Sequence, residues 1–290
     1  MTIVAGFKCW DGIVLCADTE ETKGDYSKVS RPKVLIYPAA HVFPITCRAV
    51  FASSGNASHC DHLIQKLCMV IDGVQNSDNI DTVIKKIEDE IVEVNTKWPL
   101  YDSKDEPTIS ILLAVYKDKH QALLHIEGHR VLIVTWPYHG IGYGVVLADY
   151  LAEKLYPQTT STVDASIVGL YILDQVKTHV PFCGKESQVV VLSKDGNAKY
   201  QDIVDLSGQE ALFIDFDKWM QSLLAQVVNL DVSNDVVTRS FKNSSASLLK
   251  LRDSYRHWKE MSLEIRERQQ EEFVEASSRE LEKIRKSTGR

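Results

Sequence analysis

The chain has 290 residues, of which 44% are hydrophobic and 25% charged, as is usual for a globular protein large enough to bury a substantial core. Its formal net charge of −7 argues against nucleic acid or an anionic membrane surface as the main partner. The six cysteines show no C-x-x-C spacing, and the sequence has neither a signal-peptide pattern nor a run of about 18 apolar residues, so we expect a cytoplasmic protein without a membrane partner.

The N-terminal segment predicts a β-hairpin. Apolar and β-branched residues lie on both sides of Asp11-Gly12, and an Asp-Gly pair between two such runs is typical of a tight turn. With these two residues at the centre of the turn, Trp10 pairs with Ile13. The same register brings Thr2 beside Glu21.

Further elements follow from the change between strand and helix periodicity along the chain. Asn79 or Asp81 is expected to cap the second helix. In chain order the sequence predicts strands at 33–37 and 49–55, helices at 56–74 and 79–95, three strands between 108 and 135, helices at 143–156 and 162–179, and a hairpin over 187–204 that turns at residues 194–196.

Runs of strands separated by helix pairs, with hairpins throughout, indicate antiparallel sheets rather than alternating βαβ units. We therefore expect an α+β fold: a four-layer αββα sandwich of two antiparallel sheets between helix pairs. Beyond residue 205 the sequence no longer shows the alternation of strands and helix pairs. It predicts a helix at 209–230, then a Ser/Asn-rich linker and a charged segment that is compatible with a helix. The expected organisation is a domain over 1–205 and a helical C-terminal extension over 206–290.

Thr2 directly follows the initiator methionine, and this position suggests a chemical role. Methionine aminopeptidase removes Met1 when the second residue is small, which would leave Thr2 with a free α-amine beside its own hydroxyl. An α-amine has a pKa of about 7.7–8.0 and can act as the general base for that hydroxyl. Asp18 and Lys33 would supply a carboxylate and an ammonium to tune this pair. Residue spacing alone favours a plainer interpretation, in which Thr2 begins an edge strand, Asp18 ends the hairpin and Lys33 is a surface charge.

The opening stretch resembles the N-terminus of mature proteasome β-type subunits, which are N-terminal-nucleophile hydrolases. The resemblance spans roughly residues 2–205, agrees with the expected αββα order, and has its specificity mainly in the first 60 residues. The matching features are Thr2, Gly12, the apolar run into Ala17-Asp18, Thr22 with Gly24, Lys33 followed by Val-Leu, and the small-residue turn SSGNASHC at 53–60.

The resemblance implies roles for individual residues. Thr2 would be the nucleophile and its amine the base, with Asp18 and Lys33 tuning both groups. Gly55 would supply an oxyanion N–H, or Ser54 if the alignment shifts by one residue. The backbones of Thr22 and Gly24 would bind an extended substrate strand.

Two later motifs of the family differ in this chain. The Gly-Ser-Gly motif is Gly140-Ile141-Gly142 here, so a hydroxyl is replaced by an alkyl group. The Asp-x-x-Ser-Gly motif is residues 180–184, in which Val180 replaces the carboxylate and Cys183 replaces the serine. Loss of such supporting groups can leave a site present but weakened.

The resemblance implies a threonine-type endopeptidase that cleaves peptides or unfolded proteins inside a homo-oligomeric ring, without a cofactor or metal. The bacterial stand-alone relatives of the family are homo-oligomers. An ATP-dependent unfoldase could supply its substrates. Two alternatives are a catalytically weak or inactive scaffold subunit, favoured by the two altered motifs, and an amidase of the same superfamily acting on a small amide. The segment HCDH at 59–62 is interpreted as a solvated helix start rather than a metal site, and residues 140–144 as a tight turn rather than a phosphate loop.

Overall fold

The computed structural model describes residues 2–23, 27–38, 46–97, 109–156, 160–201, 203–229 and 231–243, together with isolated positions between 245 and 260. The chain divides into two compact units, residues 1–211 and 212–290. The boundary falls inside helix α5 (Ile203–Val228). The division expected from the sequence, between residues 205 and 206, stays a prediction.

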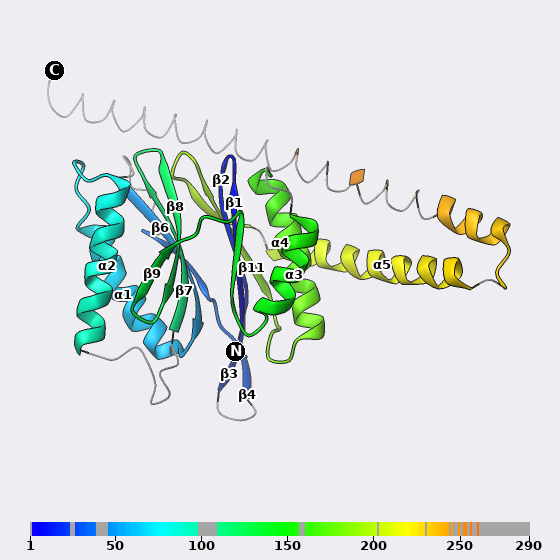
Figure 1. The fold of residues 1–290 in the computed structure, drawn as a ribbon, viewed down its shortest axis with the longest axis horizontal. Helices are drawn as coiled ribbons and strands as arrows, with labels where there is room; N and C mark the ends of the chain where they lie inside the picture. Colours follow the sequence, from blue (N-terminus) through cyan, green and yellow to red (C-terminus); the bar gives the residue numbers. More distant parts are fainter. Residues whose placement is uncertain are drawn as a thin grey trace, which may run out of the picture. The chain divides into compact units, whose positions relative to one another are not determined.

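Residues 1–211 contain two five-stranded antiparallel sheets that lie face to face (Figure 1). The first has the strand order β10-β1-β2-β11-β12, made by β1 (Ile3–Cys9), β2 (Gly12–Asp18), β10 (Tyr138–Gly142), β11 (Ser187–Ser193) and β12 (Ala198–Tyr200). The second has the order β5-β6-β7-β8-β9, made by β5 (Val34–Tyr37), β6 (Cys47–Gly55), β7 (Ile109–Lys117), β8 (His120–Glu127) and β9 (Arg130–Ile133). A separate hairpin pairs β3 (Glu20–Lys23) with β4 (Ser27–Ser30).

A helix pair covers the outer face of each sheet (Figure 1). Helices α1 (Ala57–Asp72) and α2 (Ile80–Lys97) pack on the second sheet, and α3 (Val145–Leu155) and α4 (Thr162–His179) pack on the first. The α+β fold, with its four-layer αββα sandwich, is therefore confirmed. Among the described helices, none is both long enough and apolar enough to cross a bilayer.

Strand β6 shows how the sequence builds two cores. Its side chains alternate between the two faces of the sheet, as the period of two requires. Ala49 and Phe51 belong to the core under α1 and α2, whereas Val50 and Ala52 belong to the core between the sheets. All four side chains are completely buried, because both faces of this strand are covered.

The predicted register of the first hairpin is wrong by two residues. Cys9 pairs with Gly12, so the turn is formed by Trp10 and Asp11, and Gly12 is the first residue of β2. The reason is a close approach of strand β11: a Cβ on Gly12 would lie 2.4 Å from the carbonyl oxygen of Leu192. A shift of two residues keeps every side chain on its face, but it brings the start of β1 against Asp18 instead of Glu21.

Two regions were not predicted as strands. The β3–β4 hairpin is polar and short, so it lacks an apolar alternation. Strand β10 contains two glycines and forms because it pairs with β1, Val4 lying opposite Ile141. Residues 140–142 are therefore strand, and the turn expected over 140–144 is confined to Tyr143 and Gly144. At the second helix, Asn79 is the capping residue, since its side chain accepts a hydrogen bond from the backbone N–H of Thr82 at 2.8 Å.

Candidate active site

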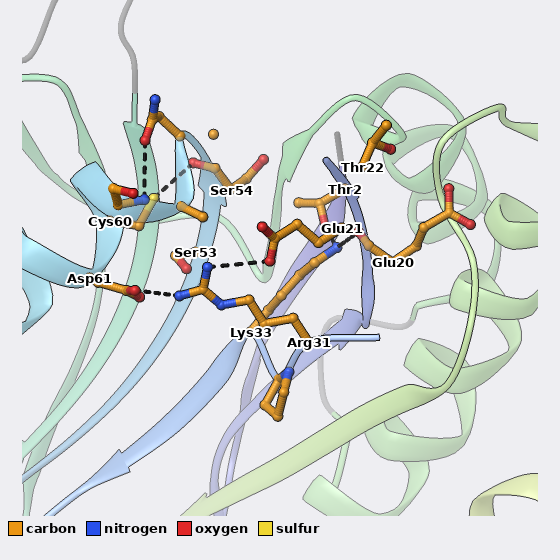
Figure 2. Close-up of a pocket in the computed structure, with 15 residues that line it drawn as sticks. Thr2, Glu20, Glu21, Thr22, Arg31, Lys33, Ser53, Ser54, Cys60 and Asp61 are labelled. Atoms are coloured by element: carbon orange, nitrogen blue, oxygen red, sulfur yellow. Dashed lines mark hydrogen bonds and ion pairs between the residues drawn. The ribbon is translucent and has the colours of Figure 1, made fainter. Parts of the chain in front are cut away.

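A cavity of about 410 Å³ opens beside the start of β1 (Figure 2). Four segments form its wall: Thr2, strand β3, the link from β4 into β5, and the end of β6 with the first turn of α1. The predicted site residues Thr2, Thr22, Lys33 and Gly55 all line this cavity, and so does Ser54. Gly24 lies outside the described residues.

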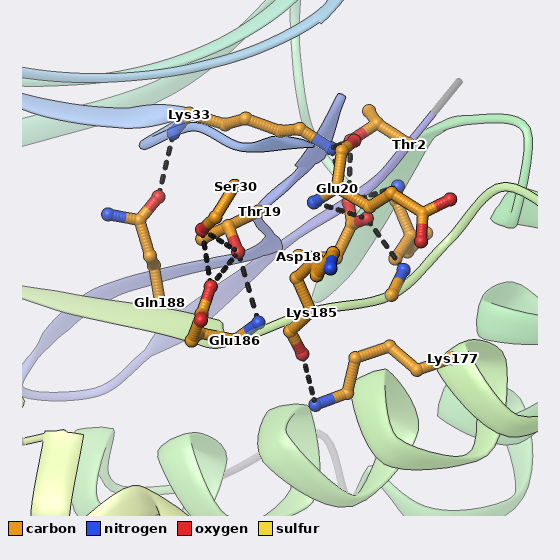
Figure 3. Close-up of polar contacts among 12 residues, drawn as sticks. Thr2, Asp18, Thr19, Glu20, Ser30, Lys33, Lys177, Lys185, Glu186 and Gln188 are labelled. Carbon is orange, nitrogen blue, oxygen red and sulfur yellow. Dashed lines mark hydrogen bonds and ion pairs between the residues drawn. The ribbon is translucent and has the colours of Figure 1, made fainter. Parts of the chain in front are cut away.

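Thr2 is 2% exposed, and its hydroxyl lies between two charged groups (Figure 3). It donates a hydrogen bond to Oδ1 of Asp18 at 2.5 Å and accepts one from Nζ of Lys33. Lys33 and Asp18 also form an ion pair with an Nζ–Oδ1 distance of 2.8 Å. The structure therefore brings the three predicted residues Thr2, Asp18 and Lys33 into direct contact, which excludes the plainer interpretation of Lys33 as a surface charge.

Asp18 is the last residue of β2 and is completely buried. Burial of a carboxylate is tolerated where hydrogen bonds replace its lost hydration. Within the described residues, five groups donate to Asp18: the Thr2 hydroxyl, Nζ of Lys33, and the backbone N–H groups of Ile3 (3.0 Å), Glu20 (3.2 Å) and Gly184 (3.0 Å). The orientation of this carboxylate is therefore set by groups from four separate segments.

Burial lowers the pKa of Lys33, and the neighbouring Asp18 carboxylate opposes this effect. A lysine with a lowered pKa can give up a proton more readily than one in water. The ammonium also donates to the carbonyl oxygen of Glu20 at 2.6 Å. Because Nζ of Lys33 also donates to the Thr2 hydroxyl, Lys33 can stabilise negative charge that develops on Thr2 Oγ1.

Gln188 positions the backbone of Lys33 and was not identified from the sequence. Its side-chain oxygen accepts hydrogen bonds from the N–H groups of Lys33 at 2.7 Å and of Val34 at 3.3 Å. Gln188 lies on β11, the neighbour of β2. A polar residue directly before the apolar run VVVL was the only signal for it in the sequence.

Gly55 ends β6 with φ +115°, a conformation that favours glycine. Asn56 follows and caps α1, its side chain accepting from the N–H groups of Ser58 and His59. The positive end of the α1 dipole therefore lies at the cavity wall, where it favours negative charge. The oxyanion role of Gly55 stays a prediction.

The two altered motifs reach the start of β1 and Asp18: Ile141 pairs with Val4, and the N–H of Gly184 donates to Asp18. Ile141 is 4% exposed and packs in the core between the sheets, so it offers no hydroxyl. Cys183 is also 4% exposed, and burial raises the pKa of its thiol to about 11. The N–H of Gly144 donates to the carbonyl oxygen of Thr2 at 3.3 Å.

The HCDH segment lies in the first two turns of helix α1, and two of its side chains have other contacts. The Cys60 thiol is buried and donates to the carbonyl oxygen of Ser54 at 3.5 Å, and Asp61 forms an ion pair with Arg31. Within the described ranges, no three His, Cys, Asp or Glu side chains gather as a metal site would require. Arg31 was not singled out in the sequence, because its partners become adjacent only in the folded chain.

Solved structures with the same fold include Anbu proteins. A Gly-1 mutant of Anbu from Hyphomicrobium sp. strain MC1 is 13% identical with a TM-score of 0.64, covering 78% of this chain and all of that one. Anbu from Yersinia bercovieri, described as an ancestral beta-subunit, is 15% identical with a TM-score of 0.63, covering 79% and 99%. The Anbu complex from Pseudomonas aeruginosa, described as a helical assembly, is 15% identical with a TM-score of 0.62, covering 77% and 95%.

At these identities the structural likeness establishes the fold alone. No curated protein sequence matches the chain. The family model for proteasome subunits matches residues 2–192, which include Thr2, Asp18, Lys33 and Gly55. The chain therefore belongs to the proteasome subunit family.

Proposed function

We propose that this protein, once Met1 is removed, is an N-terminal threonine peptidase that cleaves peptide bonds in peptides or unfolded proteins. The observation that carries the proposal is the position of the Thr2 hydroxyl, in contact with both Asp18 and Lys33 at the wall of a cavity. A hydroxyl is a weak nucleophile until a neighbouring base takes its proton. The α-amine of Thr2 would be that base.

The proposed reaction has two stages. The neutral amine takes the proton from Thr2 Oγ1, which attacks the substrate carbonyl and forms a tetrahedral intermediate. The N–H of Gly55 would stabilise the oxyanion, helped by the α1 N-terminus. The protonated amine then gives its proton to the leaving amine, and water hydrolyses the resulting ester on Thr2. Lys33 and Asp18 remain in place and hold the charge balance around Oγ1.

The proposed substrate is an extended chain. Strand β3 passes along the cavity, and the backbone groups of Thr22 and Gly24 would pair with the substrate as an added strand. We also propose a cytoplasmic homo-oligomeric ring that encloses the sites, with an ATP-dependent unfoldase as a further possible partner. The helical assembly described for the Anbu complex from Pseudomonas aeruginosa supports self-association of this chain.

A scaffold subunit without activity is the second candidate. The replacement of a hydroxyl by Ile141 and of a serine by Cys183 favours it, because neither side chain supplies the group that the family motif has at that position. An amidase acting on a small amide would use the same Thr2, and only its substrate would differ.

The intact mass of the purified protein, with and without a peptide epoxyketone, separates these functions. This reagent forms its stable ring adduct with a hydroxyl and a free amine on one residue. We expect loss of Met1 and one adduct per chain, abolished by Thr2→Ala. The matched control is Thr96→Ala, which removes an exposed threonine at the end of α2. Retention of Met1, or its loss without an adduct, would favour the scaffold; an adduct without peptide cleavage would favour the amidase.

A further inference from the structure

The described residues that line the cavity carry three carboxylates and two cations: Glu20, Glu21, Asp61, Arg31 and Lys33. Lys33 is paired with the buried Asp18. Glu20 is paired with Lys28 of strand β4, with an Oε1–Nζ distance of 2.8 Å. Lys33 and Glu20 are therefore each neutralised by one partner of opposite charge. The charged side chains that remain among the described lining residues are Glu21, Arg31 and Asp61.

Arg31 is shared between the other two carboxylates (Figure 2). Its Nη1 lies 3.3 Å from Oε2 of Glu21 on β3, and its Nη2 forms an ion pair with Asp61 on α1. One guanidinium cannot neutralise two carboxylates. Among the described lining residues, the wall formed by Glu21, Arg31 and Asp61 therefore carries one excess negative charge.

The rest of the lining does not suit a large apolar side chain. Its apolar members, among the described residues, are Pro32, Ala57 and Cys60, and the others are polar, charged or glycine. A leucine or phenylalanine would therefore bury little apolar surface against this wall. The volume, about 410 Å³, is roughly fourteen times the ~30 Å³ that one water molecule takes up in the liquid, so a long side chain can enter.

We propose that this cavity selects a lysine or arginine side chain at the substrate residue whose carbonyl carbon Thr2 attacks. The substrate cation would bind the carboxylates of Glu21 and Asp61, which it would share with Arg31. It would thereby neutralise the one excess negative charge of this group. This inference rests on the proposed peptidase function. The geometry supports it because Thr2 and the Glu21–Arg31–Asp61 group line one cavity.

The first test uses the unaltered protein, freed of Met1, and four fluorogenic peptides that differ only in the residue before the cleaved bond: Arg, Lys, Leu or Glu. We expect kcat/KM for Arg and Lys to exceed that for Leu at least 10-fold and that for Glu at least 100-fold. Raising the salt concentration should lower the ratio of kcat/KM for the Arg peptide to that for the Leu peptide, because salt screens the partly exposed charges of the cavity. A Leu or Glu peptide cleaved as well as the Arg peptide overturns the inference.

The epoxyketone reaction keeps the two proposals apart. If the adduct forms and the peptides are cleaved without a preference for Arg or Lys, the peptidase function stands and the cation selectivity is wrong. If neither adduct nor cleavage is observed, the peptidase function is wrong and the selectivity fails with it.

Charge variants test which residues are responsible. Glu21→Gln and Asp61→Asn should each reduce the Arg-to-Leu ratio about 10-fold, a typical effect of losing one charge-assisted contact. Arg31→Gln should increase the ratio, since both carboxylates are then left for the substrate. The matched control is Glu93→Gln, which removes a carboxylate on α2 outside this cavity and should leave the ratio unchanged. Equal ratios in all four variants would contradict the assignment to this wall.

Discussion

Gly142 leaves no room for a side chain beside Thr2: a Cβ at residue 142 would lie 2.4 Å from the carbonyl oxygen of Thr2. The φ angle of Gly142, +95°, is also one that residues with a side chain rarely adopt. Because Gly144 donates its N–H to the same carbonyl, the segment 142–144 holds the backbone of Thr2 from one side. The position of the hydroxyl therefore depends on a glycine 140 residues away in the chain.

Gly142→Ala should displace Thr2 and reduce peptide cleavage more than 10-fold. It should also destabilise the protein by about 1–3 kcal/mol, since it adds both a clash and an unfavourable backbone conformation. Peptide cleavage and urea unfolding measure the two effects. Gly73→Ala is the control: Gly73 has φ −81°, and the nearest atom to its added Cβ is 3.5 Å away. Equal peptide cleavage and equal unfolding free energy in the two variants would show that the close approach of Gly142 to Thr2 is not important.

Asp18→Asn should cost about 3–5 kcal/mol of unfolding free energy, because it leaves the largely buried ammonium of Lys33 without its counter-charge. It should also lower the pKa of Lys33 further, since Asp18 is the main group that raises it. The double variant Asp18→Asn/Lys33→Met should recover part of the lost stability, because no unpaired charge remains buried. Urea unfolding measures both variants.

The exposed ion pair between Glu93 and Lys97 provides the control for Asp18. Glu93→Gln should leave the unfolding free energy unchanged within error, because an exposed pair is screened by solvent. A cost for Asp18→Asn as small as that for Glu93→Gln would mean that the Asp18–Lys33 pair contributes nothing to stability.

His125 and His139 predict a loss of stability in acid. They lie on β8 and β10, in different sheets, with Nδ1 of His125 3.0 Å from Nε2 of His139. Burial, with a smaller contribution from the neighbouring His139, lowers the pKa of His125 from 6.5 to about 4. Burial also lowers the pKa of His139, against the carboxylates of Asp149 and Glu127 that raise it.

Between pH 6.5 and about 4 the unfolded chain therefore binds more protons than the folded one, so the unfolding free energy decreases as the pH falls through this window. We expect His125 to account for about 1–3 kcal/mol of this change. His125→Leu should flatten the dependence, as measured by urea unfolding at a series of pH values. The exposed His120, at the start of β8, is the control, and His120→Gln should keep the original slope. An unaltered slope in His125→Leu would rule out this histidine as the source.

Local sequence patterns determined most of the architecture. Apolar residues at helical spacing predict α1 and α2, and the alternation in β6 and β7 predicts strands, because these periods bring apolar side chains to one face of each element. The order of strands and helix pairs then leaves the four-layer sandwich as the arrangement that buries every apolar face. The residue types also indicated the candidate nucleophile: a threonine behind Met1, with a carboxylate and a lysine nearby in the chain.

Tertiary contacts determined the features that local sequence patterns could not predict. The hairpin register depends on Gly12 against Leu192, strand β10 depends on its pairing with β1, and the backbone of Lys33 depends on Gln188. Each of these contacts joins segments more than 100 residues apart, so neither partner leaves a periodic signal in its own neighbourhood. The charge of the cavity is partly of the same kind, because the β3–β4 hairpin brings Glu21 near Arg31, whereas Asp61 of α1 meets Arg31 only in the folded chain.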